Sequence, residues 1–217
     1  MTRDMIIVLV VFAVIAMLYL SREKLEGIWA LAMTAKDVYA PSAPPAPASS
    51  TTTAAMGDKS APLTGFAAKF DNSLMILGDD GVAHSFDAHK LAGVKYWAFY
   101  YSASWCGPCR RFTPDLVGFY RGFKPDHPNF ELIFVNLDEN EDAMENYMRT
   151  DSMPWPAIWR ADVDNPELEA KKYCGSGIPC LVLVDSNGNV ISDTFQGGQY
   201  TDPHHVIDDI RATVKGD

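Results

Sequence analysis

The hydrophobic positions of the chain divide it into three regions. Residues 5–20 are a run of sixteen residues without a charge. As a helix this run would extend about 24 Å, slightly less than a bilayer core of about 30 Å. Residues 41–62 have no hydrophobic period, and five prolines stand there among alanine, serine and threonine. From residue 63 onward, short apolar runs alternate with amphipathic stretches. This pattern predicts a membrane segment, a semi-stiff linker and one globular domain.

Within the globular region, the pattern predicts an α/β order of elements. The continuous aromatic and apolar run at residues 96–101 is typical of a buried central strand, and residues 130–137 form a second such run. Between them, an apolar stripe at helical spacing that reaches Phe123 predicts an amphipathic helix. The other predicted elements are a hairpin at 74–77 and 82–86, a helix at 142–149, an antiparallel strand pair at 181–184 and 190–195, and a last helix that Thr201 or Asp202 caps, with Pro203 at its first position, running to Val214. A central sheet flanked by helices accounts for this order.

The acidic charge of the protein is confined to the globular region. The chain carries 18 lysines and arginines against 28 acidic residues, a net charge of −10. Residues 1–62 hold five of each kind, so residues 63–217 hold 13 basic and 23 acidic residues. Nucleic-acid binding needs a basic surface, so this balance argues against nucleic acid as a partner. Acidity of this kind is typical of a surface that keeps a domain soluble.

Two cysteines stand at the junction between the predicted central strand and the helix after it. Cys106 begins the helix, where unpaired backbone N–H groups and the positive end of the helix dipole stabilise a thiolate and lower its pKa. Cys109 lies one helical turn further on and can reach back to close a disulfide. The alternatives are a chance pair of core cysteines or half of a zinc site, but a zinc site needs a second close pair. Cys174 and Cys180 have five residues between them and lie far along the chain. The pattern therefore predicts thiol–disulfide exchange.

The residues around this pair resemble a known family. Trp105-Cys106-Gly107-Pro108-Cys109 is similar to the active site of thioredoxins, and Pro114 matches the proline of their active-site helix. Gly177-Ile178-Pro179, followed by an apolar strand, resembles the loop that carries their cis-proline. Within the superfamily the likeness is strongest to tryparedoxins and nucleoredoxins, through residues 101–106, 112–116, 136–142 and 153–155. The resemblance extends from about residue 74 to the C-terminus.

This resemblance implies a thioredoxin-like fold, with a central mixed β-sheet flanked by helices, and a role for each residue of the site. Cys106 would be the nucleophile that attacks a substrate disulfide, and Cys109 would resolve the mixed disulfide. A cis-Pro179 would face Cys106 and leave the backbone of Ile178 free to pair with a substrate. The residues that shape the site would be Trp105, Gly107 and Pro108. The implied redox centre is the Cys106–Cys109 disulfide, with no separate cofactor and no metal.

Two positions depart from the thioredoxin pattern. Tyr100 stands six residues before Cys106, where thioredoxins carry a buried aspartate used for proton transfer. The proton transfer would then depend on Asp138, Glu139 or water. The alternative for the two acidic residues is that they only form the solvent-exposed N-terminus of a helix. Cys180 follows the predicted cis-proline, where threonine is usual. It is a candidate modulator that would compete with Cys109 for Cys106 under oxidation. The alternative is a small apolar residue in a buried strand.

The remaining cysteine and the histidines carry no predicted chemistry. Cys174 is expected to be a small buried residue. The five histidines show no ligand spacing with an acidic partner, and His204 and His205 are expected at the surface.

Together these features predict a membrane-tethered thiol–disulfide oxidoreductase. Gly107-Pro108 resembles the dipeptide of reducing thioredoxins, which favours reduction of protein disulfides. The alternatives are an oxidase or isomerase of the same fold, and a tethered binding module with a non-catalytic cysteine pair. The expected partners are protein disulfides, an upstream dithiol reductant and, from the resemblance to tryparedoxins, a downstream peroxidase.

The N-terminal region predicts a single retained membrane span. No cleavage site follows the apolar run directly, which favours an uncleaved signal anchor at residues 1–24 over a cleaved signal peptide or a buried helix. Residues 25–62 would form an interfacial helix and the linker, and residues 63–217 the thioredoxin-like domain. The linker composition favours an extracytoplasmic, periplasmic domain. Arg3 before the run and Arg22 and Lys24 after it favour the alternative, the cytoplasmic face.

Overall fold

The computed structural model describes residue 63 and residues 65–215. The predicted anchor at 1–24 lies outside these residues, as do the predicted interfacial helix and linker at 25–62. Among the described residues, no helix has the length and hydrophobicity that a membrane crossing requires.

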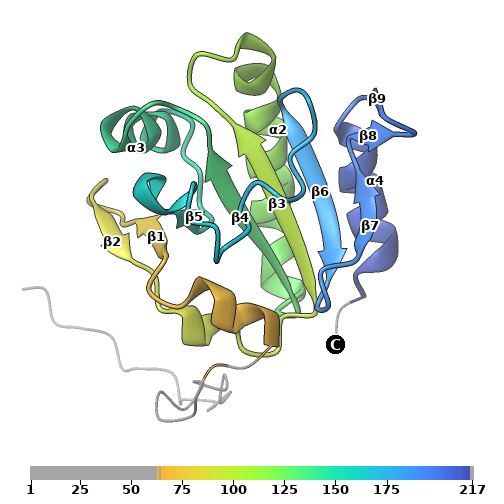
Figure 1. The fold of residues 1–217 in the computed structure, drawn as a ribbon, viewed down its shortest axis with the longest axis horizontal. Helices are drawn as coiled ribbons and strands as arrows, with labels where there is room; N and C mark the ends of the chain where they lie inside the picture. The colour runs from red at the N-terminus through yellow and green to blue at the C-terminus, as the bar shows by residue number, and fades with distance from the viewer. Residues whose placement is uncertain (1–62, 64, 216–217) are drawn as a thin grey trace, which may run out of the picture. The chain divides into compact units, whose positions relative to one another are not determined.

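A seven-stranded mixed sheet forms the centre of the described domain, in the order β2-β1-β5-β4-β3-β6-β7 (Figure 1). Its strands are β1 (Leu74–Leu77), β2 (Ala83–Ser85), β3 (Tyr96–Ser102), β4 (Phe130–Asn136), β5 (Ala157–Ile158), β6 (Cys180–Asp185) and β7 (Val190–Asp193). The central strand β3 runs parallel to β4 and antiparallel to β6. The predicted mixed sheet and its central strand are thereby confirmed.

Helices cover both faces of this sheet. Three α-helices pack on one face, and Figure 1 shows α2 and α4 behind the strands. These helices are α2 (Gly107–Phe123), α3 (Glu141–Thr150) and α4 (His204–Thr213). The shorter 3-10 helices are η1 (Gly65–Phe70), η2 (Ala88–Leu91), η3 (Lys124–Asp126) and η4 (Arg160–Asp162). The first two of these pack on the other face.

Alternation along the strands divides the core into two clusters. On β3, Tyr100 points to the face that α2, α3 and α4 cover, and Tyr101 points to the opposite face. On β6, Leu181 shares the first face, and Cys180 shares the second. Because successive strand residues face opposite ways, this parity decides which side chains can approach α2 and its cysteines.

The main differences from the sequence prediction among the strands and α-helices lie in three places. The predicted strand at 190–195 ends at Asp193, and a separate hairpin follows, β8 (Phe195–Gln196) with β9 (Gln199–Tyr200). Its turn needs the left-handed backbone that glycine tolerates, and Gly197 and Gly198 have φ of 60° and 83°. The two-residue strand β5 was not predicted at all. Helix α4 begins one residue later than predicted, because Pro203 is the residue before its first turn.

A buried network of hydroxyl groups ties α2 to the sheet directly beneath the cysteine pair. Thr113 Oγ1 donates to the carbonyl oxygen of Cys109 at 2.9 Å and accepts from the hydroxyls of Tyr100 and Tyr147, each at 2.8 Å. Ser102 Oγ lies 2.9 Å from the Tyr147 hydroxyl. Burial raises the pKa of both Tyr100 and Tyr147 above the usual value for tyrosine. Both tyrosines therefore stay neutral near pH 7, and the network joins β3, α2 and α3 without a charge.

Thr113→Val tests whether this network holds α2 in place. Valine keeps the shape of threonine but leaves the buried Tyr100 hydroxyl without its partner. We expect the free energy of unfolding in urea to fall by about 1–3 kcal/mol. Phenylalanine at position 100 has no hydroxyl that could be left unpaired. In a Tyr100→Phe background, Thr113→Val should therefore be less destabilising. An equal loss in both backgrounds would show that the Tyr100–Thr113 bond contributes nothing.

Candidate active site

Cys106 and Cys109 form a disulfide at the start of α2, with their Cα atoms 5.2 Å apart. Cys106 is the residue before the first helical turn, and its Sγ accepts the backbone N–H of Cys109 at 3.2 Å. Cys106 is 5% exposed and Cys109 is fully buried, so Cys106 is the member of the pair that a substrate can reach. An N–H group at a helix terminus stabilises negative charge, and here one points at the more exposed sulfur.

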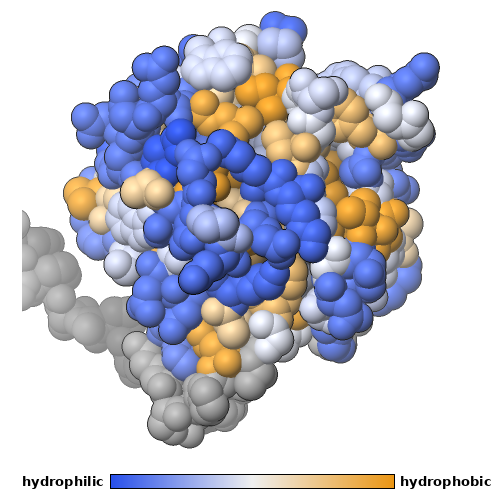
Figure 2. Space-filling model, in the orientation of Figure 1, coloured by the Kyte–Doolittle hydropathy of each residue, from blue (hydrophilic) through white to orange (hydrophobic). Residues whose placement is uncertain are grey.

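The second wall of the site is the loop before β6. The Ile178–Pro179 peptide bond is cis, and the carbonyl oxygen of Ile178 lies 3.7 Å from Cys106 Sγ. Trp105 stands beside Cys106 and is 68% exposed. Figure 2 shows hydrophobic surface among hydrophilic residues at the top of the view, where Figure 1 places the end of β3 and the start of α2. The structure thus brings Trp105, Ile178 and Pro179 together around the sulfur of Cys106, the more exposed of the two cysteines.

The loop that leads into α2 is fixed by the carboxylate of Asp138. This carboxylate accepts the backbone N–H of Ser104 at 3.0 and 3.1 Å, the hydroxyl of Ser104 at 2.8 Å and the side-chain amide of Asn136 at 2.7 Å. Asp138 is buried, and Glu139 is exposed. The hydrogen-bonding capacity of the Asp138 carboxylate is thus largely taken up by its neighbours. Its position supports a role in placing the loop rather than the acid–base role considered from the sequence.

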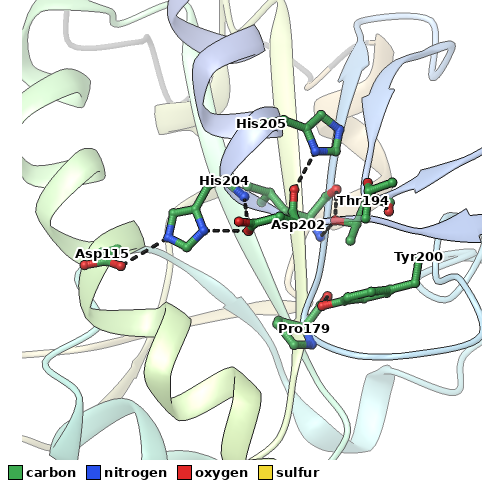
Figure 3. A network of polar contacts seen from close by, with 9 residues as sticks. Asp115, Pro179, Thr194, Tyr200, Asp202, His204 and His205 are labelled. Atoms are coloured by element: carbon green, nitrogen blue, oxygen red, sulfur yellow. Dashed lines mark hydrogen bonds and ion pairs between the residues drawn. The ribbon is translucent and has the colours of Figure 1, made fainter.

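A pocket of about 570 Å³ opens beside the disulfide. Its lining residues include Pro108, Arg111, Phe112 and Asp115 from α2, together with Pro179 and Tyr200. At its rim, His204 lies between two carboxylates (Figure 3). Its Nδ1 is 2.6 Å from Asp202 and its Nε2 is 3.1 Å from Asp115. The hydrogen bonds to Asp202 and then to Asp115 raise the pKa of His204 above its usual value of 6.5.

Sequence spacing identified no acidic partner for His204 and placed it at the surface. The structure leaves it half-exposed and adds two carboxylates beside it. The Asp202 contact is local, two residues away at the start of α4, and could have been anticipated from the sequence. The Asp115 contact joins α2 to α4 across 89 residues, and only the packing of these helices reveals it. Tyr200 was also missed, because the hairpin that carries it was not predicted.

The modulator role considered for Cys180 is not supported by its position. Cys180 is fully buried on the face of the sheet opposite α2, and its Sγ lies 4.0 Å from the carbonyl oxygen of Tyr173. Burial raises the pKa of its thiol to about 11. Cys174 packs against the same cluster, half-buried, and burial raises the pKa of its thiol as well. The alternation of side chains along β6 therefore favours the alternative in which Cys180 is a small apolar residue packed in the core.

Among the described residues, no group of three or more histidine, cysteine or acidic side chains is placed to hold a metal ion.

The chain is similar to proteins of one superfamily. A family model described as thioredoxin-like matches residues 93–190. A probable nucleoredoxin 1 from Arabidopsis thaliana is 38% identical over 108 residues, which are 50% of this chain and 18% of that protein. The chain thus spans about a fifth of the length of that relative.

Two solved structures are matched over nearly their whole length and over about two thirds of this chain. Tryparedoxin I from Leishmania major is 32% identical over 68% of this chain and 93% of that one, with a TM-score of 0.49. Tryparedoxin II in complex with glutathionylspermidine is 29% identical over 69% of this chain and 96% of that one, with a TM-score of 0.51.

The contacts of His204 at the rim of the pocket predict that the stability of the folded protein depends on pH. Because its pKa is raised in the folded protein, protonated His204 contributes stability that is fully present below about pH 6.5 and is lost as the pH rises through the raised value. The charged residues near it are Asp115 and Arg111 on α2 and Asp202 before α4. We expect an NMR titration to place the His204 midpoint above 6.5 and Asp202→Asn to lower it. Asp208→Asn, which removes the partner of Arg211 instead, is the matched control. A midpoint that Asp202→Asn leaves unmoved would contradict the assignment.

Proposed function

The chain belongs to the thioredoxin superfamily of thiol–disulfide oxidoreductases, and we propose that it reduces protein disulfides through the Cys106–Cys109 pair. The observation that carries this proposal is the placement of the pair. The more exposed sulfur lies at the N-terminus of α2 and beside the cis peptide bond of Ile178 and Pro179. A substrate disulfide that approaches this sulfur would meet the backbone of the Ile178–Pro179 loop on one side and Trp105 on the other.

The reaction begins from the reduced pair. The Cys106 thiolate attacks one sulfur of the substrate disulfide, the substrate S–S bond breaks, and a mixed disulfide forms while the first substrate thiolate leaves and takes up a proton. Cys109, as a thiolate, then attacks Cys106 Sγ, which forms the Cys106–Cys109 bond and releases the second substrate thiol. Two electrons have passed to the substrate, and the protein is left in the oxidised state that the structure contains. An external dithiol restores the reduced pair by the same exchange in reverse.

Each step has a physical support in the structure. The helix terminus and the Cys109 N–H stabilise a thiolate at Cys106 and lower its pKa. The burial of Cys109 keeps an external disulfide away from it but leaves it within bonding distance of Cys106. The order of attack, Cys106 first and Cys109 second, follows from this difference in access.

The partners we propose follow from the superfamily. Tryparedoxin II has been solved with glutathionylspermidine, a thiol-containing compound of low molecular weight. By analogy, this protein would receive electrons from a dithiol reductant and pass them to protein disulfides, with a thiol-dependent peroxidase as one candidate. The exposed Trp105 and the pocket that Pro108 and Pro179 help to line are the surfaces beside the pair that such a substrate would contact.

We also propose that the domain is tethered to a membrane and lies outside the cytoplasm. The support is in the sequence: an uncharged run of sixteen residues, no cleavage site directly after it, and a proline-rich linker of the kind that holds a domain away from a bilayer. The proposed organisation is an anchor at 1–24, an interfacial helix and linker at 25–62, and the redox domain at 63–217.

Cysteine substitutions test the assignment of the two thiols. Cys106→Ser should abolish reduction of insulin disulfides, whereas Cys109→Ser should accumulate mixed disulfides with the substrate, because the resolving step is lost. In the reduced protein, iodoacetamide should alkylate Cys106 before Cys109. The pKa of the Cys106 thiol should be about 7, compared with about 8.5 for free cysteine. Cys174→Ser should retain activity as the matched control. Faster alkylation of Cys109 than of Cys106 would reverse the assignment.

The reduction potential of the pair tests the direction of electron flow. A value near that of thioredoxin, about −270 mV, is expected for a reductase. A value near that of the strong oxidant DsbA, about −120 mV, would replace the proposal with a disulfide oxidase.

Membrane extraction of the full chain tests the tether. We expect the protein to remain with the membrane pellet at alkaline pH, and Phe12→Lys to shift it toward the supernatant because a charge in the middle of a span costs about 2.5–3.5 kcal/mol. Protease added to intact vesicles or spheroplasts then reports which side the domain occupies. A soluble product with a new N-terminus near Met33 would show a cleaved signal peptide instead.

A further inference from the structure

The β8–β9 hairpin contacts the loop that carries the cis-proline. The hydroxyl of Tyr200 donates to the carbonyl oxygen of Pro179 at 3.1 Å. Figure 3 shows the Tyr200 side chain extending toward Pro179, with its hydroxyl end next to that residue. The carbonyl of Ile178, one peptide unit earlier, lies 3.7 Å from Cys106 Sγ. Tyr200 is therefore bonded to the same short segment that forms the second wall of the active site.

The base of the hairpin is fixed to the strand that follows the cis-proline. Thr194 is fully buried, and its hydroxyl bonds both backbone groups of Leu181, at 2.9 and 3.0 Å. Thr201 bonds the carbonyl oxygen of Thr194 twice, through its N–H and through its hydroxyl, each at 2.8 Å. Tyr200 thus extends from a base that cannot shift relative to β6 without breaking buried hydrogen bonds.

The rings of the hairpin also pack on the residues that lead into the cis-proline. The Phe195 and Tyr200 rings meet edge to face, with centroids 5.4 Å apart. A Cβ atom at Gly175 would lie 2.0 Å from the Phe195 ring, so the backbone approaches this ring as only glycine allows. At Gly177 the corresponding contacts, with Phe195 and Tyr200, are ordinary van der Waals distances of 3.8 and 3.9 Å. The hairpin and the loop therefore form one packed unit.

We propose that Tyr200 is a positioning residue for the substrate-binding backbone at Ile178 and Pro179. Its hydroxyl fixes the orientation of the Pro179 carbonyl and so limits rotation of the segment that faces Cys106. This inference rests on the proposed function, in which that backbone pairs with an extended protein substrate. It adds a requirement that the proposed function does not contain, namely that an element outside the cysteine motif and the cis-proline loop sets the affinity for protein disulfides.

The size of the substrate should separate this role from simple packing. A protein disulfide pairs with the loop backbone, whereas a small aromatic disulfide reacts at Cys106 with little use of that backbone. Tyr200→Phe keeps the ring and its contact with Phe195 and removes one hydrogen bond. We expect KM for a protein disulfide to rise about three- to tenfold, the range that one hydrogen bond supports, with a smaller change in kcat. KM for the small disulfide should change at most a third as much.

Tyr173→Phe is the matched control. Its hydroxyl also donates to a backbone carbonyl, that of Gly188, at 3.0 Å, but at a turn away from the cysteine pair. Both variants lose one tyrosine–carbonyl bond, so thermal unfolding compares their general effect on stability. Thr201→Val is a second, milder test, because it removes one of the two bonds at the base of the hairpin and leaves Tyr200 in place. It should raise KM for the protein disulfide in the same direction and by less.

The outcomes are distinct for the inference and for the proposed function. A selective rise in KM for the protein disulfide in Tyr200→Phe, absent in Tyr173→Phe, supports the positioning role. If KM for the protein disulfide does not rise, the positioning role is overturned and the proposed function stays intact. The same holds if KM rises equally for both disulfides, as in the Tyr173→Phe control. A wild-type protein that fails to reduce either disulfide, although Cys106 is alkylated normally, overturns the proposed function itself. If Tyr200→Phe fails to fold, an unchanged KM in Thr201→Val overturns the inference.

Discussion

The position of Cys106 depends on the carboxylate of Asp138. Asp138 follows β4 and Ser104 follows β3, and the two parallel strands end in register, with Ser102 opposite Asn136. The loops after them therefore start at the same edge of the sheet, where the carboxylate accepts both the N–H and the hydroxyl of Ser104. Hydrogen bonds to a charged acceptor are roughly twice as strong as neutral ones. They fix the point at which α2 begins, and with it the backbone N–H group that meets Cys106 Sγ.

The opposite wall of the site is set by an antiparallel register. Strand β6 begins where β3 ends, because Cys180 pairs with Tyr101. Pro179 stands directly before β6 and Cys106 a few residues after β3, so the two loops face each other across the edge of the sheet. A slip of one residue in this register would turn every β6 side chain to the other face and move Ile178 away from Cys106. The apolar runs of β3 and β6 that fill the two cores therefore also determine the geometry of the redox site.

The sequence predicted those parts of the protein that local pattern decides. The buried strands, the amphipathic α2 and the strand–helix junction at Cys106 each have a strong hydrophobic period, and each was placed within a few residues. The face that Cys180 occupies depends on its pairing with Tyr101, which a single sequence does not display. Strand β5 is two residues long, too short to show a period, and the β8–β9 hairpin has only two residues in each strand. His204 and Tyr200 join the site through contacts between segments far apart in the chain, and so they could not be found from spacing alone.

The replacement of a buried aspartate by Tyr100 changes the electrostatics beneath the cysteines. An ionised carboxylate near a thiol disfavours the thiolate, whereas a neutral hydroxyl carries no charge to oppose it. Here Tyr100 and Tyr147 have a raised pKa and Thr113 carries no charge, so the network supports the first turn of α2 without adding negative charge. The same network offers no carboxylate to accept the proton of Cys109, and the Asp138 carboxylate is occupied by Ser104 and Asn136. In the proposed reaction the first substrate thiolate leaves beside the pair and is itself a base. That leaving group, directly or through solvent, can take the proton of Cys109 as the second disulfide exchange begins.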